Sequence, residues 1–327
     1  MTNTPSPAEI RAAVRDNPKL RARDLAQNLG ITEGELVAAH CGETARRITV
    51  DFEKIFPGLE AAGEVMALTR NENAVHEKIG VYDKYISGKH AAMMLGEKID
   101  TRMFPEKWAH GFALESADGD SVKRSLQFFD AQGMAVHKVH ARPATDIDKW
   151  NALVDRLIID DQSEGMTVIA AETAWETVAE VPLDELRDRW TRMKDTHQFV
   201  TLLRKLNVAR IDAIRAIGED FAWRIDNSSV EAMLKLSANE KLPIMCFVGN
   251  EAFIQIHSGP VSNIKTMGPW LNIMDADFHL HLRADRIKEV WAVRKPTDKG
   301  HVTSLEAYDA DGELIIQFFG KRIEGQD

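Results

Sequence analysis

The chain has 327 residues, of which 44% are hydrophobic and 28% are charged, and its formal net charge is −10. This length predicts two domains or two related halves, because one hydrophobic core rarely grows beyond about 250–300 residues. The acidic balance disfavours nucleic acid and anionic membranes as partners, and two cysteines are too few for a disulfide scaffold. The sequence shows no apolar run near the ~20 residues of a membrane helix and no signal-peptide pattern, so we expect a cytoplasmic protein.

Helical and strand-like patterns alternate along the chain. Residues 8–40 have a helical pattern, and residues 48–145 are mostly strand-like, with short apolar or β-branched runs separated by turn residues. Helical patterns return at 146–159 and 183–217, and residues 243–323 are again strand-like. This order of helices, strands, helices and strands indicates a duplicated unit.

A shift of 179 residues aligns the two strand-rich segments without a gap. The matches cluster at turns and strand starts: Asn71 and Glu72 with Asn250 and Glu251, Ser125 and Leu126 with Ser304 and Leu305, and Gly133 with Gly312. A shift of 177 aligns the helical segments. We therefore predict an α+β fold, a tandem duplication of a unit with a large antiparallel β-sheet plus helices. The expected boundaries are 1–160 for the first repeat, 161–182 for a connector and 183–327 for the second repeat. Because ligand sites favour domain interfaces, the cleft between the halves is the expected site.

The segment 24–39 resembles a helix-turn-helix, with Gly30 in the turn. Its second helix would begin at Glu33, contains Glu35, and has no Lys or Arg. A recognition helix needs side chains that reach bases and phosphates. We therefore favour a helical hairpin that covers a sheet over a transcriptional regulator.

His197 lies in an amphipathic pattern with spacings of three and four residues, formed by Leu183, Leu186, Trp190, Met193, His197 and Val200. The pattern predicts one continuous helix with His197 on its apolar stripe. A histidine that faces the interior needs partners for its ring nitrogens. Either a protein acceptor satisfies it or a ligand or metal does, and the pattern alone favours the protein acceptor.

Several segments have a familiar order and spacing: Asp100-Thr-Arg-Met-Phe, Trp108-Ala-His-Gly-Phe, Lys194-Asp-Thr-His-Gln-Phe, Gln255-Ile-His-Ser-Gly-Pro-Val, Gly268-Pro-Trp-Leu-Asn, Phe278-His-Leu-His-Leu-Arg, Val293-Arg-Lys-Pro-Thr, Ser304-Leu-Glu-Ala-Tyr-Asp and Gln317-Phe-Phe-Gly-Lys-Arg-Ile-Glu-Gly. Together the segments resemble the bacterial haemin-degrading or haemin-transport proteins of the HemS/HmuS type. The resemblance covers nearly the whole chain. It implies the same duplicated α+β fold, with a haem in the cleft between the halves.

The resemblance also implies the residues of the haem site. His197 would be the one axial ligand of the iron, and Arg102 would act as a catalytic residue on the distal side. The remaining contacts would be Phe104 and Phe247 as walls of the porphyrin pocket, and Lys295 and Arg322 at the propionates, with Gln317 and Phe319 nearby. Phe319 departs from the family pattern, because several relatives carry Tyr there. A haem needs such an imidazole, apolar faces and cations at its propionate edge.

Two functions follow from the resemblance. The protein would accept imported haem and take part in haem degradation and iron release by oxidative ring opening, with an external electron donor and O2 or peroxide. Alternatively, it would be a non-enzymatic carrier or buffer that delivers haem to a separate haem oxygenase. The expected partners are haem, a haem importer and a downstream haem oxygenase, with no nucleic acid and no membrane span.

Overall fold

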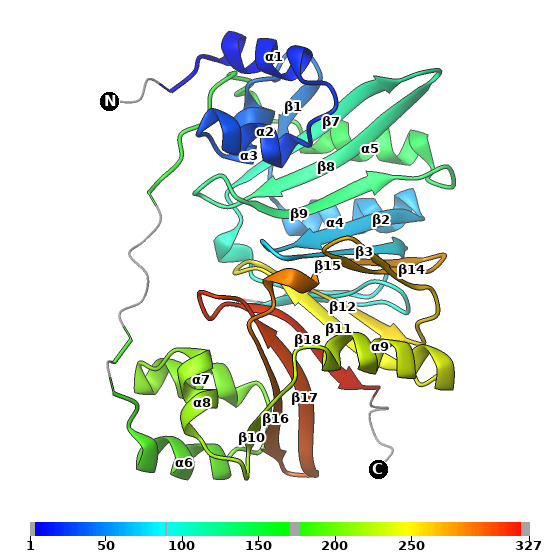
Figure 1. Ribbon diagram of the computed structural model, residues 1–327. Coiled ribbons are helices and arrows are strands. Elements are labelled where there is room, and N and C mark those ends of the chain that lie inside the picture. The colour runs from blue at the N-terminus through cyan, green and yellow to red at the C-terminus, as the bar shows by residue number, and fades with distance from the viewer. Residues whose placement is uncertain (1–3, 89, 171–176, 179, 322–327) are drawn as a thin grey trace. The chain divides into compact units, whose positions relative to one another are not determined.

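The computed structural model describes residues 4–88, 90–170, 177–178 and 180–321 (Figure 1). The chain divides into two compact units. The first unit contains the described residues of Met1–Arg70, His76–Ala171 and Gly249–Gln255. The second unit contains those of Asn71–Val75, Glu172–Val248 and Ile256–Asp327. Each unit therefore includes one short segment from the half of the sequence that otherwise forms the other unit.

The described residues form nine α-helices, none of them long and apolar enough to cross a bilayer. The helices of the first unit are α1 (Pro7–Asp16), α2 (Ala22–Leu29), α3 (Glu33–Ala38), α4 (Phe52–Ala62) and α5 (Ile147–Leu157). Those of the second unit are α6 (Leu183–Thr191), α7 (Gln198–Leu206), α8 (Arg210–Ala216) and α9 (Ser229–Glu240).

The strands are distributed evenly between the two halves of the sequence. The first half contains β1 (Ala45–Ile48), β2 (Val65–Arg70), β3 (Ala74–Gly80), β4 (Tyr85–Ile86), β5 (Ala92–Leu95), β6 (Asp100–Met103), β7 (His110–Asp118), β8 (Ser121–Phe129) and β9 (Ala135–Ala141). The second half contains β10 (Ala222–Ile225), β11 (Ile244–Gly249), β12 (Phe253–Gly259), β13 (Ile264–Met267), β14 (Trp270–Met274), β15 (Phe278–Arg283), β16 (Glu289–Thr297), β17 (Gly300–Tyr308) and β18 (Leu314–Gly320). Two short 3-10 helices, η1 (Pro105–Lys107) and η2 (Ala284–Arg286), precede β7 and β16.

Each unit is built on the same order of strands. In the first unit, six strands follow each other in the order β1-β7-β8-β9-β2-β3. In the second unit, the corresponding order is β10-β16-β17-β18-β11-β12. The pairings from β1 to β2 and from β10 to β11 are antiparallel. Each unit also contains a group of three strands, β4-β5-β6 or β13-β14-β15.

The two halves of the sequence correspond element by element. Adding 179 to the bounds of β3, β7, β8, β9 and η1 reproduces the bounds of β12, β16, β17, β18 and η2. Adding 177 carries α1–α4 onto α6–α9 within one or two residues at each end. A β-bulge between Phe128 and Phe129 recurs between Ala307 and Tyr308, again 179 residues later. The predicted α+β fold with a tandem duplication is therefore confirmed.

Each unit receives one turn from the other half of the sequence, Asn71–Val75 in the second unit and Gly249–Gln255 in the first. These two exchanged turns make the same contacts. In the second unit, the side-chain amide of Asn71 donates to the carbonyl of Ile315 at 2.8 Å. In the first unit, the amide of Asn250 donates to the carbonyl of Val136 at 2.9 Å. Both members of the second pair are related to the first by the 179-residue shift. The duplication thus preserves which residues meet as well as the element order.

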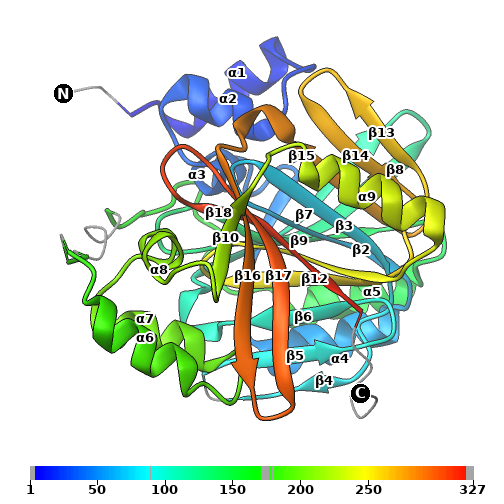
Figure 2. The same ribbon diagram turned by 60° about the horizontal axis from the view of Figure 1, so that its bottom comes forward.

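Each sheet carries helices on both of its faces. In the first unit, α3 packs against Phe112 and Phe129 on one face, and α4 and α5 cover Leu126 and Phe128 on the other. In the second unit, α6, α7 and α8 pack with Val293 and Tyr308, whereas α9 covers the opposite face. Figure 2 shows β16 and β17 as a long hairpin with α6 and α7 beside it.

The predicted helical hairpin at 24–39 is present as α2 and α3, and it covers a sheet as expected. Leu36 and Val37 of α3 are buried, and the backbone N–H of Gly34 donates to the carbonyl of Gly133 at 3.0 Å. Glu33, at the start of α3, points into the unit and bonds the side chains of Arg70 and Lys138. This helix is therefore bound to its own sheet along the face that a recognition helix would need for DNA.

One segment predicted to be strand-like contains a helix. Within residues 48–145, α4 buries Phe52, Ile55, Phe56 and Leu59, which recur at helical spacing. Pro57 interrupts this pattern in the sequence, but it lies inside the helix. The burial of four large apolar side chains outweighs the local cost of proline.

Candidate functional site

His197 lies between two helices and not within one, so the prediction of a continuous helix is wrong. The helix α6 ends at Thr191, α7 begins at Gln198, and His197 occupies the N-cap position of α7. Its side chain is 86% exposed, so the interpretation of His197 as a satisfied core histidine is also wrong. The spacing of the apolar residues predicted one buried stripe, but only its middle part is buried. Leu186, Trp190 and Met193 lie in the core, whereas His197 and Val200 face solvent.

The imidazole of His197 is oriented by a neighbouring carboxylate. Its Nδ1 lies 2.6 Å from Oδ1 of Asp195, and the same oxygen accepts the backbone N–H of His197 at 2.7 Å. These hydrogen bonds lower the pKa of Asp195. With Nδ1 as the donor, Nε2 is the nitrogen left to bind a metal, which is the arrangement that metal-ligating histidines commonly show. The residue thus fits the axial ligand of a haem iron.

Four predicted site residues share one face of the second unit's sheet. Opposite partners in the antiparallel ladder place Phe247 beside Gln317, and Gln317 beside Glu306. Phe319 follows Gln317 by two residues and so has the same orientation. Lys295 joins them through a hydrogen bond to Glu306. The face is also the one that carries α6–α8, and His197 lies between α6 and α7.

Phe247 and Phe319 form an aromatic pair on this face. Their ring centroids are 4.9 Å apart and the ring planes make an angle of 61°. Both side chains are partly exposed. Phe319 therefore contributes apolar surface at the position where the resemblance would place a tyrosine. The pair suits contact with a flat apolar ligand.

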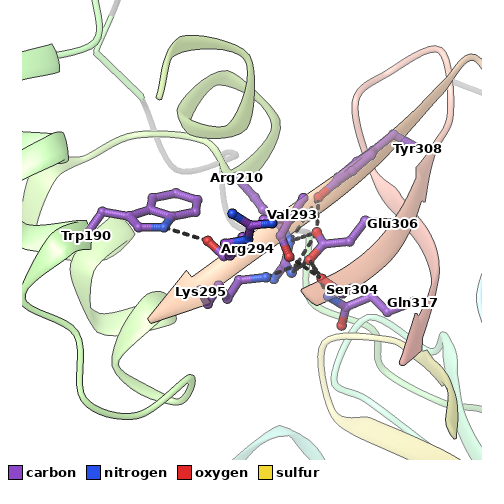
Figure 3. A network of polar contacts seen from close by, with 9 residues as sticks. All are labelled: Trp190, Arg210, Val293, Arg294, Lys295, Ser304, Glu306, Tyr308 and Gln317. Atoms are coloured by element: carbon purple, nitrogen blue, oxygen red, sulfur yellow. Dashed lines mark hydrogen bonds and ion pairs between the residues drawn. The ribbon is translucent and has the colours of Figure 1, made fainter. Parts of the chain in front are cut away.

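Glu306 is the centre of a buried polar network that Figure 3 shows from close by. Its carboxylate is fully buried and accepts both Nε and a terminal nitrogen of Arg210 at 2.8–3.0 Å. The ammonium of Lys295 donates to it at 2.6 Å. Three neutral donors complete the set: the hydroxyls of Ser304 and Tyr308 and the side-chain amide of Gln317. Buried charges persist in proteins when they are paired and bonded in this way.

The charges of this network are held by mutual attraction. Burial alone would raise the pKa of Glu306, but Arg210 and Lys295 lower it far below its usual range. Burial lowers the pKa of Lys295 to about 8, against the opposing attraction of Glu306. At pH 7 the network contains two cations and one carboxylate. The network therefore carries one positive charge in excess.

Arg102 and Phe104 lie in the first unit, on β6 and directly after it. The guanidinium of Arg102 bonds the carboxylate of Asp100 and donates to the carbonyl of Thr101 at 3.0 Å. Its side chain is 29% exposed. The backbone N–H of Phe104 donates to the carbonyl of Ala252 at 3.0 Å. Arg322, the last predicted site residue, lies outside the described residues.

Sequence reasoning missed three side chains that hold the predicted residues in place: Asp195, Arg210 and Glu306. A signal for Glu306 was present, since Ser304, Glu306 and Tyr308 alternate along one strand and so share a face. Three polar groups on one buried face indicate a hydrogen-bonded network. Arg210 carried no such signal, because a cation that opens a short helix is ordinarily solvated.

The first unit holds a different polar cluster in its core. The ring of His137 is fully buried, with Nε2 2.5 Å from the hydroxyl of Tyr82 and Nδ1 2.8 Å from the hydroxyl of Thr69. Thr69 also donates to the side-chain carbonyl of Gln255 at 2.7 Å. Phe253 stacks on the imidazole with ring centroids 4.0 Å apart. Burial lowers the pKa of His137 to about 3, so the ring is neutral at pH 7.

Comparison with known proteins gives consistent matches over the whole chain. Residues 30–157 and 207–327 match the family model described as the haemin-degrading HemS.ChuX domain. The hemin transport protein HemS of Yersinia enterocolitica is 40% identical over 316 residues, covering 96% of this chain and 91% of that protein.

Solved structures agree with this match. Holo-PhuS, a heme-binding protein from Pseudomonas aeruginosa, is 41% identical with a TM-score of 0.95, covering 98% of this chain and 95% of that one. ChuS, described as an E. coli heme oxygenase, is 35% identical with a TM-score of 0.89 and the same coverage. These identities extend over nearly the full length of each chain. The chain therefore belongs to the family of haemin-degrading HemS.ChuX domain proteins.

Proposed function

We propose that this protein binds haem on the face of the second unit's sheet that carries α6–α8, with His197 as the axial ligand of the iron. The observation that carries the proposal is the exposed imidazole of His197, whose Nδ1 is held by Asp195 at 2.6 Å. This geometry leaves Nε2 toward solvent for coordination. The family and the relatives named above as heme-binding or hemin transport proteins support haem as the ligand.

The surrounding residues supply the other contacts that a haem needs. Phe247 and Phe319 offer partly exposed aromatic surface, and the network around Glu306 leaves one positive charge in excess, which favours anionic propionates. Lys295 and Gln317 both bond Glu306. Direct contact of Lys295 or Arg322 with a propionate, and a cleft between the halves as the pocket, stay predictions from the resemblance.

We further propose that the bound haem is degraded, so that the protein releases iron from haem in the cytoplasm. The haem iron itself would supply the redox chemistry, with electrons from an external donor and O2 or peroxide as oxidant. His197 would hold the iron on one side, and the guanidinium of Arg102 would act on the other as a hydrogen-bond donor. One solved relative described as a heme oxygenase supports this proposal.

The haem-binding proposal is tested by absorption spectroscopy of haemin titrated into the protein. Replacement His197→Ala should abolish the spectrum of histidine-ligated haem while leaving the far-UV circular dichroism unchanged. The matched control is His301→Ala, since His301 is also exposed and lies in the same unit. If the His197→Ala complex keeps both the spectrum and the affinity of the unmodified protein, the assignment is wrong.

The choice between enzyme and carrier is tested on the haem complex. The complex is given an electron donor under air in the presence of catalase, which removes free peroxide and so prevents non-enzymatic destruction of haem. A degrading enzyme yields an open tetrapyrrole and free iron, and Arg102→Ala should slow this reaction more than it weakens binding. Intact haem that transfers to a separate haem oxygenase would instead identify a carrier.

A further inference from the structure

The first turn of α7 is held to the preceding loop by backbone hydrogen bonds, from Gln198 to Asp195 and from Phe199 to Thr196, and to the core by one aromatic side chain. His197 occupies the N-cap position, but its side chain makes no capping hydrogen bond to the helix. Phe199, two residues later, is 2% exposed and packs against Trp190 with ring centroids 4.8 Å apart. The ring of Phe199 therefore anchors the first turn of α7 in the core of the second unit.

Two cations contact the ring of Phe199, and both are bound to Glu306. The guanidinium carbon of Arg210 lies 5.0 Å from the ring centroid, and the ammonium of Lys295 lies 4.8 Å from it. Cations at such distances from an aromatic ring are attracted to it, most strongly where water is excluded. Arg210 comes from α8 and Lys295 from β16, so the ring is fixed from a helix and from the sheet.

The loop that carries His197 is tied to the same strand. The indole N–H of Trp190 donates to the carbonyl of Arg294 at 3.0 Å, and the N–H of Asp298 donates to the carbonyl of Lys194 at 2.9 Å. The end of α6 and the loop 192–197 are thereby attached to β16 and to the residue after it, at Arg294 and Asp298. Lys295, which lies between these two points along the chain, is held by Glu306.

We infer that Glu306 is a positioning residue for haem binding: it fixes Arg210 and Lys295 around Phe199, seats the first turn of α7, and so sets the direction of the His197 imidazole. The inference rests on the proposed function for its link to haem. The structural part, the seating of α7 by Glu306, stands apart from it. On this assignment Lys295 stabilises the site through its contact with Phe199 and its bond to Glu306. A contact of Lys295 with a propionate is a separate prediction.

The test compares Glu306→Gln with Glu33→Gln, which neutralises the buried carboxylate that bonds two cations in the first unit. Haemin affinity should fall about 10–100-fold in Glu306→Gln, the range usual for residues that orient a metal ligand, and stay unchanged in Glu33→Gln. Free imidazole should restore the histidine-ligated spectrum to Glu306→Gln. An equal loss of affinity in both variants, or no loss in either, would overturn the inference.

Hydrogen exchange on the ligand-free protein gives a readout that needs no haem. The amides of residues 198–203 should exchange faster in Glu306→Gln and at the original rate in Glu33→Gln. Unchanged protection of these amides in Glu306→Gln would overturn the inference even if the protein binds haem as proposed. If the unmodified protein shows no histidine-ligated spectrum, the proposed function fails, and exchange alone decides whether Glu306 seats α7.

A second variant covers the case in which Glu306→Gln does not fold. Phe199→Leu keeps an apolar side chain in the core but removes the ring that Arg210 and Lys295 contact. It should reproduce the loss of haemin affinity, the recovery with imidazole and the faster exchange of α7. A Phe199→Leu protein with normal affinity and normal exchange would contradict the inference.

Discussion

The two units keep one scaffold but place different chemistry on it. In both units one carboxylate is buried between two cations, on the face of the sheet that carries α3 in the first unit and α6–α8 in the second. Glu33 lies with Arg70 and Lys138, and Glu306 lies with Arg210 and Lys295. The carboxylates are not equivalent, however. Glu33 corresponds to Arg210 by the shift of 177, so the helix supplies the anion in one unit and a cation in the other.

The same comparison separates the two units at the proposed ligand. The position that corresponds to His197 in the first unit is Leu20, an exposed apolar residue that has no atom able to bind iron. The core cluster around His137 is likewise not repeated in the second unit, since the counterparts of its histidine and its tyrosine are apolar. His137 corresponds to Ile316 and Tyr82 to Val261, and both counterparts are buried. Backbone register can thus be retained while each unit acquires its own polar groups.

The largest effect should come from neutralising the two buried carboxylates. Glu306→Gln should lower the free energy of unfolding by about 3–5 kcal/mol, because it leaves Arg210 and Lys295 without their anion and disturbs the bonds of three neutral donors. Glu33→Gln should cost less, about 1.5–3 kcal/mol, because the carboxylate of Glu33 bonds two cations and lacks the three further donors that Glu306 has. Urea unfolding at pH 7 measures both values.

The acid side of the stability profile sharpens this prediction. The folded-state pKa of Glu306 is lowered, so its contribution is complete above the ordinary pKa of about 4.5 and is lost as the pH falls below it. The stability difference between Glu306→Gln and the unmodified protein should therefore shrink between pH 5.5 and pH 3.5. A difference that stays constant over this range would show that Arg210 and Lys295 do not lower the pKa of Glu306 in the folded protein.

The exchanged turns should respond alike in the two units. Asn71→Ala and Asn250→Ala each remove the side-chain amide that donates to a backbone carbonyl and the oxygen that accepts N–H groups within the turn. Each replacement should cost about 1–3 kcal/mol, the penalty for leaving buried polar groups unpaired. Differential scanning calorimetry of the two variants measures the costs. Strongly unequal values would show that equal geometry does not mean equal energetics here.

Asp195→Asn tests the residue that orients the proposed ligand. An amide in place of the carboxylate weakens the hydrogen bond to Nδ1 of His197, so haemin affinity should fall about 10–100-fold. The control is Asp188→Asn, a carboxylate on α6 in an exposed ion pair with Arg192, which should leave affinity unchanged. Isothermal titration with haemin gives both values. If Asp195→Asn binds like the unmodified protein, the 2.6 Å contact does not govern coordination.

The duplicated fold was predictable from the sequence, whereas the site was predictable only in part. Turn residues such as Asn71, Asn250, Gly133 and Gly312 recur at one offset because both copies need the same local backbone geometry. The environment of His197 was not predictable in this way. Its apolar spacing resembles a continuous helix, and the break at 192–197 is accompanied by two bonds to a distant part of the chain, from Trp190 to Arg294 and from Asp298 to Lys194. Partners that lie so far apart in the sequence cannot be predicted from a local pattern.

The buried histidine of the first unit gives the last and smallest test. The pKa of His137 is lowered by burial from 6.5 to about 3, so as the pH falls below 6.5 the unfolded chain binds a proton that the folded chain does not. Stability should then decrease by up to about 1.4 kcal/mol per pH unit for this one group. His140, whose pKa is lowered to about 4, acts in the same direction but is present in every variant compared.

His137→Gln should reduce the slope of unfolding free energy against pH between 6.5 and 4.5, while His301→Gln, at an exposed site, should leave it unchanged. An unchanged slope in His137→Gln would mean that the ring of the folded protein takes up a second proton as readily as the unfolded chain does. The hydroxyl of Tyr82 would then have to accept from Nε2, whereas in the neutral network it donates to Nε2 while Thr69 accepts from Nδ1.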